Sequence, residues 1–121
     1  MECNYVERAE NVIKSLKNKK IDLTTSKIRN ILSMVSDLYN DAQRLNNCEK
    51  LSDEMYMRTQ YLKMRLAYEA GRDKITKDFI EKAELIEEID NIKKSKTALL
   101  DFCHYVEALV AYHKYYIAKE I

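Results

Sequence analysis

The sequence predicts an all-α protein that folds as a single antiparallel bundle of about five helices. The chain has 121 residues, of which 46% are hydrophobic and 34% charged, as in ordinary globular proteins. It contains one glycine and no proline, whereas sheets joined by tight turns need many residues with positive φ. No internal repeat or long linker is visible, so we expect residues 1–121 to form one domain.

The first two expected helices carry apolar side chains at helical spacing. The first spans roughly residues 4–18, and a lysine-rich connector follows it. The second begins after Thr24 or Thr25 and runs to about Asn46. A threonine is a good N-cap because its hydroxyl accepts a hydrogen bond from a backbone N–H of the first turn.

Ser52, Thr76 and Ser95 are the expected N-caps of the third, fourth and fifth helices. Gly71 is the expected C-cap of the third helix, because glycine adopts the left-handed conformation without steric cost. The fifth helix continues almost to the C-terminus. His113 lies within its apolar stripe, and we interpret it as a core histidine with a satisfied hydrogen bond.

The third helix carries a line of arginines between two apolar stripes. At about 100° per residue, Arg58, Arg65 and Arg72 fall on one side of the helix, and we name them the arginine line. The Met57 stripe consists of Met57, Tyr61, Met64 and Tyr68, and the Met55 stripe of Met55, Leu62 and Leu66. Either this helix touches two partners, or both stripes pack within the chain and the arginines extend from buried stems to water.

The formal net charge of +1 conceals two segments of opposite charge. Residues 14–29 hold six cations and one acidic residue, and residues 78–90 hold six acidic residues and one cation. Solvated helix faces and a local electrostatic field are both consistent with this pattern. On the second helix, the side opposite the core reads Arg29, Ser33, Ser36 and Asn40. Such short polar side chains would let a phosphate backbone approach closely.

The tyrosines of the fifth helix offer a further pattern. Tyr105, Tyr112 and Tyr116 line the margin of its apolar stripe, where a ring is buried and its hydroxyl reaches water. Packing at a bundle edge or an interface is the simpler interpretation. Stacking of nucleobases on these rings is the alternative.

Residues with catalytic or metal-binding potential are few. His104 and His113 are nine residues apart, which places them on different faces of one helix. Cys3, Cys48 and Cys103 are widely spaced, which favours free thiols in a reducing cytoplasm. No stretch approaches the ~20 consecutive apolar residues of a membrane span. We therefore expect a cytoplasmic protein with no catalytic residues, no metal, no cofactor and no membrane partner.

Three stretches together resemble a known family. They are residues 23–29 (LTTSKIR), 61–72 (YLKMRLAYEAGR) and 102–114 (FCHYVEALVAYHK). Their order, their spacing and the chain length resemble the small subunit of the type III-A CRISPR effector, the Csm complex, over about residues 20–116.

This resemblance implies a non-catalytic helical bundle, present in several copies that stack along a ribonucleoprotein. The implied partners are target RNA, the guide RNA–target duplex, neighbouring copies of the chain, and the backbone and large subunits of the Csm complex. The cations within the matching stretches are Arg29, Lys63, Arg65, Arg72 and Lys114, and we expect RNA contacts among them. Arg58 is added on helical geometry alone.

Two alternatives remain open. The chain could be a helical adaptor that binds only proteins and whose arginine line meets acidic partner surfaces. It could also be a small enzyme that uses Cys103 or His113.

Overall fold

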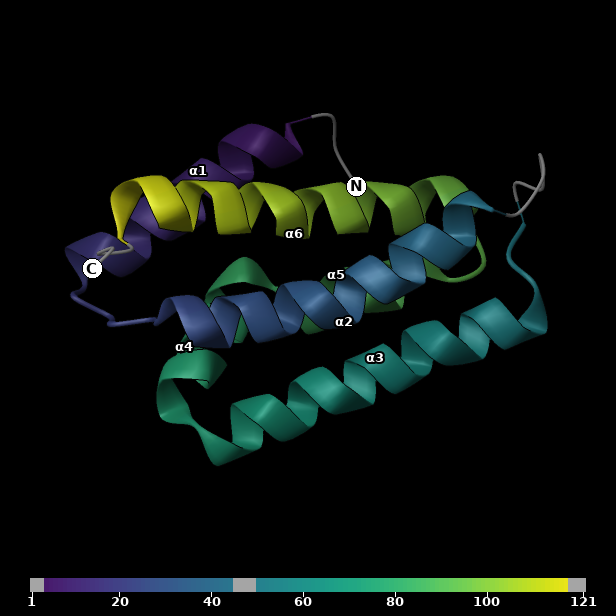
Figure 1. The fold of residues 1–121 in the computed structure, drawn as a ribbon, viewed down its shortest axis with the longest axis horizontal. Coiled ribbons are helices and arrows are strands. Elements are labelled where there is room, and N and C mark those ends of the chain that lie inside the picture. Colours follow the sequence, from purple (N-terminus) through teal and green to yellow (C-terminus); the bar gives the residue numbers. More distant parts are fainter. Residues whose placement is uncertain (1–3, 45–49, 118–121) are drawn as a thin grey trace.

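The computed structural model describes residues 4–44 and 50–117 (Figure 1). Its helices are α1 (Tyr5–Asn18), α2 (Thr25–Gln43), α3 (Asp53–Arg72), α4 (Lys74–Ala83), α5 (Leu85–Ile92) and α6 (Lys96–Tyr116). Within these residues, the only β-type pairing is an isolated bridge between Lys50 and Ser95. The all-α class is confirmed, with six helices in the described residues where about five were expected. None of these helices is both long and apolar enough to cross a membrane.

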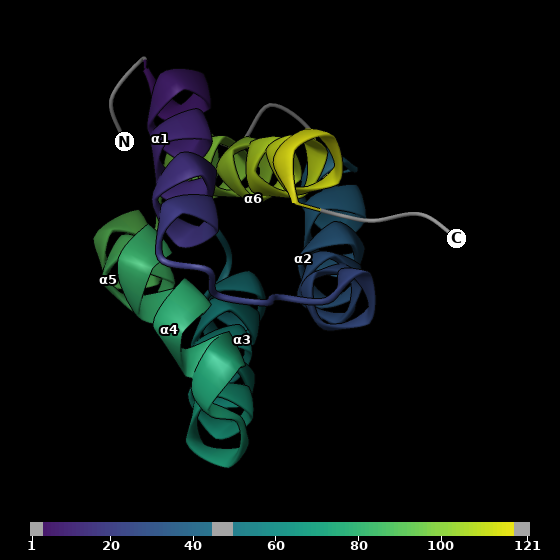
Figure 2. The same ribbon diagram turned by 90° about the vertical axis from the view of Figure 1, so that its left-hand side faces the viewer.

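The helices surround one core. α2 lies between α3 and α6 and runs in the direction opposite to both (Figure 1). α1 packs on α6, while α4 and α5 pack on α3, so the helices enclose a common centre (Figure 2). Buried side chains from all six helices fill this centre, and the largest of them are Tyr105, Phe79 and Phe102.

Three expected N-caps are confirmed. The hydroxyls of Thr24, Ser52 and Ser95 accept hydrogen bonds from the backbone N–H three residues later, at 3.3, 3.1 and 3.1 Å. Each satisfies one N–H group that would otherwise lack a partner at the start of a helix. The expected end of the second helix at Asn46 lies outside the described residues.

The junction between α3 and α4 differs from the prediction. Gly71 lies inside α3 without a positive φ, and Thr76 lies in the first turn of α4, so neither is the predicted cap. Asp73, with φ −149° and ψ 116°, ends α3 and caps α4. Its carboxylate accepts hydrogen bonds from the Thr76 N–H at 3.1 Å and from the Thr76 hydroxyl at 2.6 Å. One extended residue therefore serves both helices, and no left-handed glycine is needed.

The single fourth helix that we expected is broken at Glu84, which has the left-handed angles φ 57° and ψ 40°. The buried side chains explain the break. Those of α4 are Thr76, Phe79, Ile80 and Ala83, and those of α5 are Leu85, Ile89 and Ile92. In one continuous helix the two sets would lie roughly 160° apart around the axis. The left-handed residue redirects the chain so that both sets face the core.

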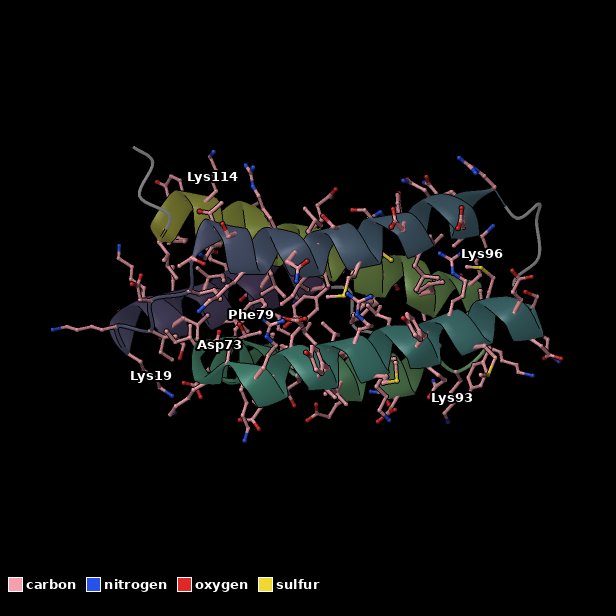
Figure 3. The ribbon with its side chains drawn as sticks, turned by 60° about the horizontal axis from the view of Figure 1, so that its bottom comes forward. Lys19, Asp73, Phe79, Lys93, Lys96 and Lys114 are labelled. Atoms are coloured by element: carbon pink, nitrogen blue, oxygen red, sulfur yellow. The ribbon has the colours of Figure 1, made fainter. Side chains whose placement is uncertain are left out.

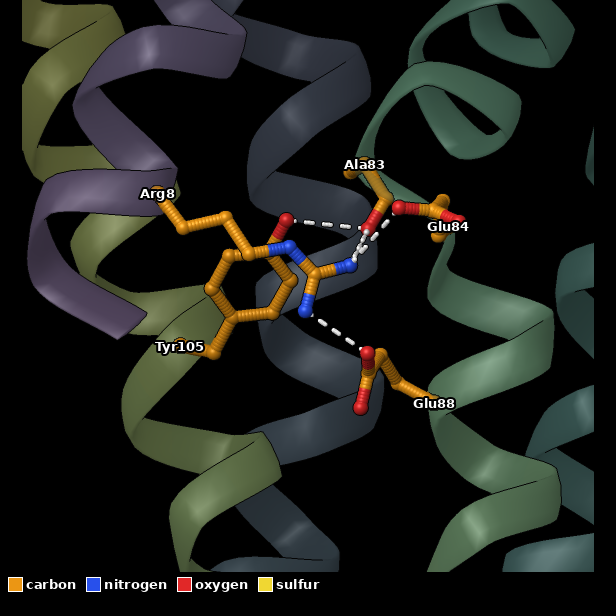
Figure 4. A network of polar contacts seen from close by, with 5 residues as sticks. All are labelled: Arg8, Ala83, Glu84, Glu88 and Tyr105. Atoms are coloured by element: carbon orange, nitrogen blue, oxygen red, sulfur yellow. Dashed lines mark hydrogen bonds and ion pairs between the residues drawn. The ribbon is translucent and has the colours of Figure 1, made fainter. Parts of the chain in front are cut away.

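Arg8 of α1 holds this break in place (Figure 4). Its guanidinium donates hydrogen bonds to the carboxylates of Glu88 and Glu84, at 2.6 and 3.1 Å, and to the Ala83 carbonyl at 3.3 Å. It also lies 4.8 Å from the centre of the Tyr105 ring. Part of the acidic segment is therefore neutralised by α1 instead of being only solvated.

Tyr105 corrects another prediction, because its side chain is fully buried and its hydroxyl does not reach water. The hydroxyl donates a hydrogen bond to the Ala83 carbonyl at 2.9 Å, at the last turn of α4, where the helix breaks. Burial raises the pKa of Tyr105 to about 12. Tyr112 and Tyr116 are half-buried, as expected for the margin of the stripe.

The turn between α5 and α6 generates a stability prediction. Lys93 has φ 52° and ψ −119°, a conformation that strains residues with a side chain but suits glycine. Lys93→Gly should raise the free energy of unfolding by about 1 kcal/mol in urea denaturation. Lys77→Gly, at an exposed position inside α4, is the matched control and should lower it by about 1 kcal/mol. Equal losses in the two variants would contradict a strained turn.

The cap at Asp73 generates a prediction about pH. Hydrogen bonds from Thr76 and Lys27 lower the pKa of Asp73 from 3.8 to about 2. Because the folded pKa is the lower one, the ionised carboxylate stabilises the fold at neutral pH, and this contribution is lost as pH falls from about 4 to about 2. Asp73→Asn keeps an acceptor but removes the charge, so it should lower Tm at pH 7 and have little effect at pH 2. The same Tm difference at both pH values would refute a role for the charge.

Candidate nucleic-acid interface

Stretch 23–29 lies at the same end of the molecule as the C-terminal ends of stretches 61–72 and 102–114. α2 begins there, while α3 and α6 end there, because α2 runs opposite to both (Figure 1). The Lys27 ammonium at the start of α2 lies 2.9 Å from the Asp73 carboxylate that follows α3. We name this end the cationic end and define it by three exposed residues: Arg29, Arg72 and Lys114.

His113 joins the last turn of α6 to the segment before α2. Its side chain is 1% exposed, and its Nε2 lies 2.6 Å from the Leu23 carbonyl oxygen. A carbonyl oxygen can only accept, so Nε2 carries the proton and donates. The expectation of a satisfied core histidine is confirmed. This contact places the last turn of α6 beside the segment that leads into α2.

Arg29 and Arg72 keep hydrogen-bond donors available at this end. Arg29 is exposed and makes no ion pair with any residue that the structure describes. The Arg72 guanidinium lies 3.8 Å from the Glu69 carboxylate and 5.7 Å from the centre of the Tyr68 ring. Exposed pairs at such a distance contribute little to stability, and a guanidinium has five N–H donors. Both arginines can therefore bind an additional anion.

Lysines of the basic segment extend the positive charge. Lys19, at the end of α1, lies toward the same end of the molecule as Asp73 and Lys114, whereas Lys93 and Lys96 lie toward the other (Figure 3). The side chains of Lys17, Lys19 and Lys20 are exposed.

The tyrosines at the end of α6 are unequally accessible. The ammonium groups of Lys14 and Lys17 lie 5.6 and 5.8 Å from the centre of the Tyr116 ring, and Tyr115 packs edge-on against that ring. Tyr116 also donates a hydrogen bond to Glu10 at 2.6 Å. Tyr115 is 78% exposed, so it is the most accessible of these rings.

Two of the residues predicted to bind RNA form ion pairs within the chain. Arg58 forms an ion pair with Asp41 of α2, and the Lys63 ammonium lies 2.6 Å from the Asp90 carboxylate of α5. Both pairs join α3 to a neighbouring helix. Their cations are therefore already partly neutralised before any ligand binds.

Arg65 occupies a third kind of environment. It lines a groove of about 660 Å³ between α2 and α3, together with Met34, Leu38 and Tyr61. It forms no ion pair with any of the described residues. Among the described residues, the arginine line thus consists of one internally paired side chain (Arg58), one without an ion pair (Arg65) and one weakly paired (Arg72).

The two stripes of α3 have different environments. Met55, Leu62 and Leu66 are buried at 5, 4 and 0% exposure. Met57, Tyr61, Met64 and Tyr68 are exposed at 63, 57, 55 and 62%. Within residues 4–44 and 50–117, no neighbouring helix covers the Met57 stripe. The interpretation in which both stripes pack within the chain is therefore wrong for this part of the protein.

A short repeat on α3 differs from the expectation that the chain has no internal repeat. Met57-Arg58 and Tyr61 recur seven residues later as Met64-Arg65 and Tyr68. The sequence shows this repeat as three residue types (Met, Arg and Tyr) that recur after seven residues. It was missed because it covers only part of one helix.

The remaining candidate groups are less accessible. On α2, Ser36 is half-buried against α6, so it interrupts the polar line that begins at Arg29. Cys103 is 4% exposed, and burial raises the pKa of its thiol to about 12. Cys3 and Cys48 lie outside the described residues. In the described segments, no three histidine, cysteine or carboxylate side chains lie close enough together to hold a metal ion.

Comparison with known proteins agrees with the resemblance of the three stretches. The family model of type III-A Csm2 matches residues 3–119. The CRISPR system Cms protein Csm2 of Streptococcus thermophilus is 43% identical over 120 residues, which cover 97% of this chain and 94% of that protein. The Mycobacterium tuberculosis (strain H37Rv) protein of the same name is 40% identical over 119 residues, with the same coverage. That of Enterococcus italicus is 40% identical over 96 residues, or 78% of this chain and 68% of that protein. The chain therefore belongs to the Csm2 family, the small subunits of type III-A CRISPR complexes.

Proposed function

We propose that this chain is a non-catalytic small subunit of a cytoplasmic type III-A CRISPR interference complex and contacts the backbone of target RNA beside the guide–target duplex. The observation that carries this proposal is that α2 begins where α3 and α6 end, and that each of these three helix ends carries an exposed cation: Arg29, Arg72 or Lys114 (Figure 1). These cations come from three helices and from three stretches that resemble the family.

The proposed recognition is electrostatic and independent of RNA sequence. Guanidinium and ammonium groups neutralise phosphates and release counterions, while base pairing elsewhere in the complex reads the sequence. Arg58 and Lys63 contribute less, because Asp41 and Asp90 already partly neutralise them. Arg65 lies two turns before Arg72, away from the cationic end and beside the groove, so its contribution to RNA binding should be smaller.

Several copies are needed for useful affinity. Three cations in one copy make few phosphate contacts, so the isolated chain should bind RNA weakly. Copies held side by side, together with the backbone and large subunits of the complex, gain affinity through effective concentration. We therefore infer that the chain acts as a repeated subunit along the RNA.

The environments of two reactive side chains support a non-catalytic role. The raised pKa of Cys103 keeps its thiol protonated at neutral pH, and a protonated thiol is a poor nucleophile. The Nε2 of His113 is engaged by the Leu23 carbonyl inside the core. Neither residue is therefore well placed for the small-enzyme alternative.

The cationic end generates a binding prediction. Replacing Arg29, Arg72 and Lys114 together by alanine should weaken RNA binding and reduce the slope of log K against log[salt] by roughly one unit per lost contact. Each exposed substitution should change the free energy of unfolding by at most ~0.5 kcal/mol. A salt titration with two unrelated RNA sequences, combined with thermal melts on the same preparations, measures both effects.

Two control variants make that experiment specific. Arg44→Ala removes an exposed arginine just after the far end of α2 and should leave RNA binding unchanged. Leu62→Ala should lower the free energy of unfolding by ~2–5 kcal/mol without changing the salt slope. If the triple variant lowers Tm and leaves RNA binding per folded molecule unchanged, the adaptor that binds only proteins is the better account.

The non-catalytic role generates a separate prediction. Labelled single-stranded RNA incubated with the purified chain and magnesium or manganese should remain intact. Cys103→Ala and His113→Gln are the variants to compare. RNA cleavage that co-purifies with the chain and disappears in either folded variant would establish the enzyme alternative.

A further inference from the structure

The Met57 stripe has the spacing of a helix–helix contact. Its members follow one another at intervals of four, three and four residues, the pattern by which coiled-coil helices pack. The buried side of α3 has the same intervals at Met55, Thr59, Leu62 and Leu66. α3 therefore has two such surfaces, of which one packs in the core of this chain and the other is exposed.

We propose that the Met57 stripe is a docking site for an amphipathic helix of a different protein, with an acidic side chain of that helix facing Arg65. This proposal is independent of the RNA contacts at the cationic end. A helix with apolar side chains at matching intervals would bury four large side chains that are now 55–63% exposed. Methionine suits such a surface, since its flexible side chain adapts to the partner's shape.

The charge beside the stripe indicates an acidic partner. Each arginine of the line flanks the stripe, at the kind of position where charges select the partner in coiled coils. Arg58 and Arg72 have the carboxylates of Asp41 and Glu69 nearby. Arg65 makes no ion pair among the described residues, although Asp37 and Glu54 line the same groove. A carboxylate of the partner helix beside Arg65 would give this arginine an ion pair, as Arg58 and Arg72 already have.

A second copy of this chain fits the stripe less well. If two copies pair through α3 in antiparallel fashion, the arginine lines face each other, and like charges repel. If they pair in parallel, Arg65 faces side chains such as Gln60 and Ala67, which carry no charge. Elsewhere in the described residues, the exposed large apolar side chains are Val6 on α1 and Tyr115 on α6. Each stands alone on its helix, so neither offers an apolar stripe on which the Met57 stripe of a second copy could pack.

RNA also fits the stripe less well. The thioethers of Met57 and Met64 have no hydrogen-bond donor for a phosphate. Tyr61 and Tyr68 are seven residues apart, which is about 10.5 Å along the helix. That distance is roughly three base steps of ~3.4 Å, so the two rings cannot stack on adjacent bases. The apolar stripe therefore favours protein, whereas the cationic end favours RNA.

Photo-crosslinking in the assembled complex tests which molecule covers the stripe. Met64 is replaced by photoreactive benzoylphenylalanine, the complex is isolated and irradiated, and the crosslinked fragments are sequenced by mass spectrometry. We expect a fragment of another protein that has apolar residues at intervals of three and four and acidic residues beside them. The same probe at Lys77, exposed on α4, is the control. Crosslinks from Met64 to RNA, to this chain or to nothing above the control level would overturn the proposal.

Substitutions then test the charge. Arg65→Glu should reduce the amount of the crosslinked protein that co-purifies with this chain by about tenfold or more. With Arg65→Lys, which keeps the positive charge, most of that protein should still co-purify. Met64→Glu should reduce retention similarly and leave RNA binding by the isolated chain unchanged. If Met64→Glu weakens RNA binding and spares the protein contact, the docking proposal fails. Loss of RNA binding in the triple variant of the cationic end is a separate result, so the two proposals fail independently.

Discussion

The hydrogen bond from buried His113 to the Leu23 carbonyl fixes the end of the molecule on which the candidate site depends. It is formed in the core, where an unpaired carbonyl would cost roughly 1–3 kcal/mol. With the Lys27–Asp73 ion pair it holds the start of α2 against the ends of α6 and α3. Because α2 runs opposite to both helices, the start of α2 and the ends of α3 and α6 lie at one end of the molecule, and each carries an exposed cation. The cationic end is thus a consequence of helix direction and two polar contacts.

Local signals predicted the beginnings of helices well and their junctions poorly. Thr24, Ser52 and Ser95 were recognisable as caps because a cap depends on residues three positions away. The break at Glu84 depends on a change in which side of the helix is apolar, and one apolar pattern was extended across it. The sequence wrongly predicted that the Tyr105 hydroxyl reaches water. The hydroxyl instead donates to the Ala83 carbonyl, which is available as an acceptor because α4 ends there.

The residue types of the candidate site could be predicted from the sequence, but which of its cations form ion pairs within the chain could not. Sequence alone places Arg58, Arg65 and Arg72 on one side of a helix. It does not show that Arg58 meets Asp41 or that Lys63 meets Asp90, because these carboxylates lie on other helices. The structure therefore separates cations that join helices from those that face outward. It also leaves two surfaces of different chemistry, one charged and one apolar, as a subunit in contact with both RNA and protein would need.

The most direct test of the central claim is the mapping of RNA contacts on the intact chain by NMR. Single-stranded RNA is titrated into the isotope-labelled protein, and shifts of the backbone amide resonances are followed. We expect the largest shifts together in three separate segments, around Arg29, Arg72 and Lys114, and little change around Arg44 and Lys50 at the other end. Shifts concentrated around Arg44 and Lys50, or along the acidic helices α4 and α5, would contradict RNA binding at the cationic end.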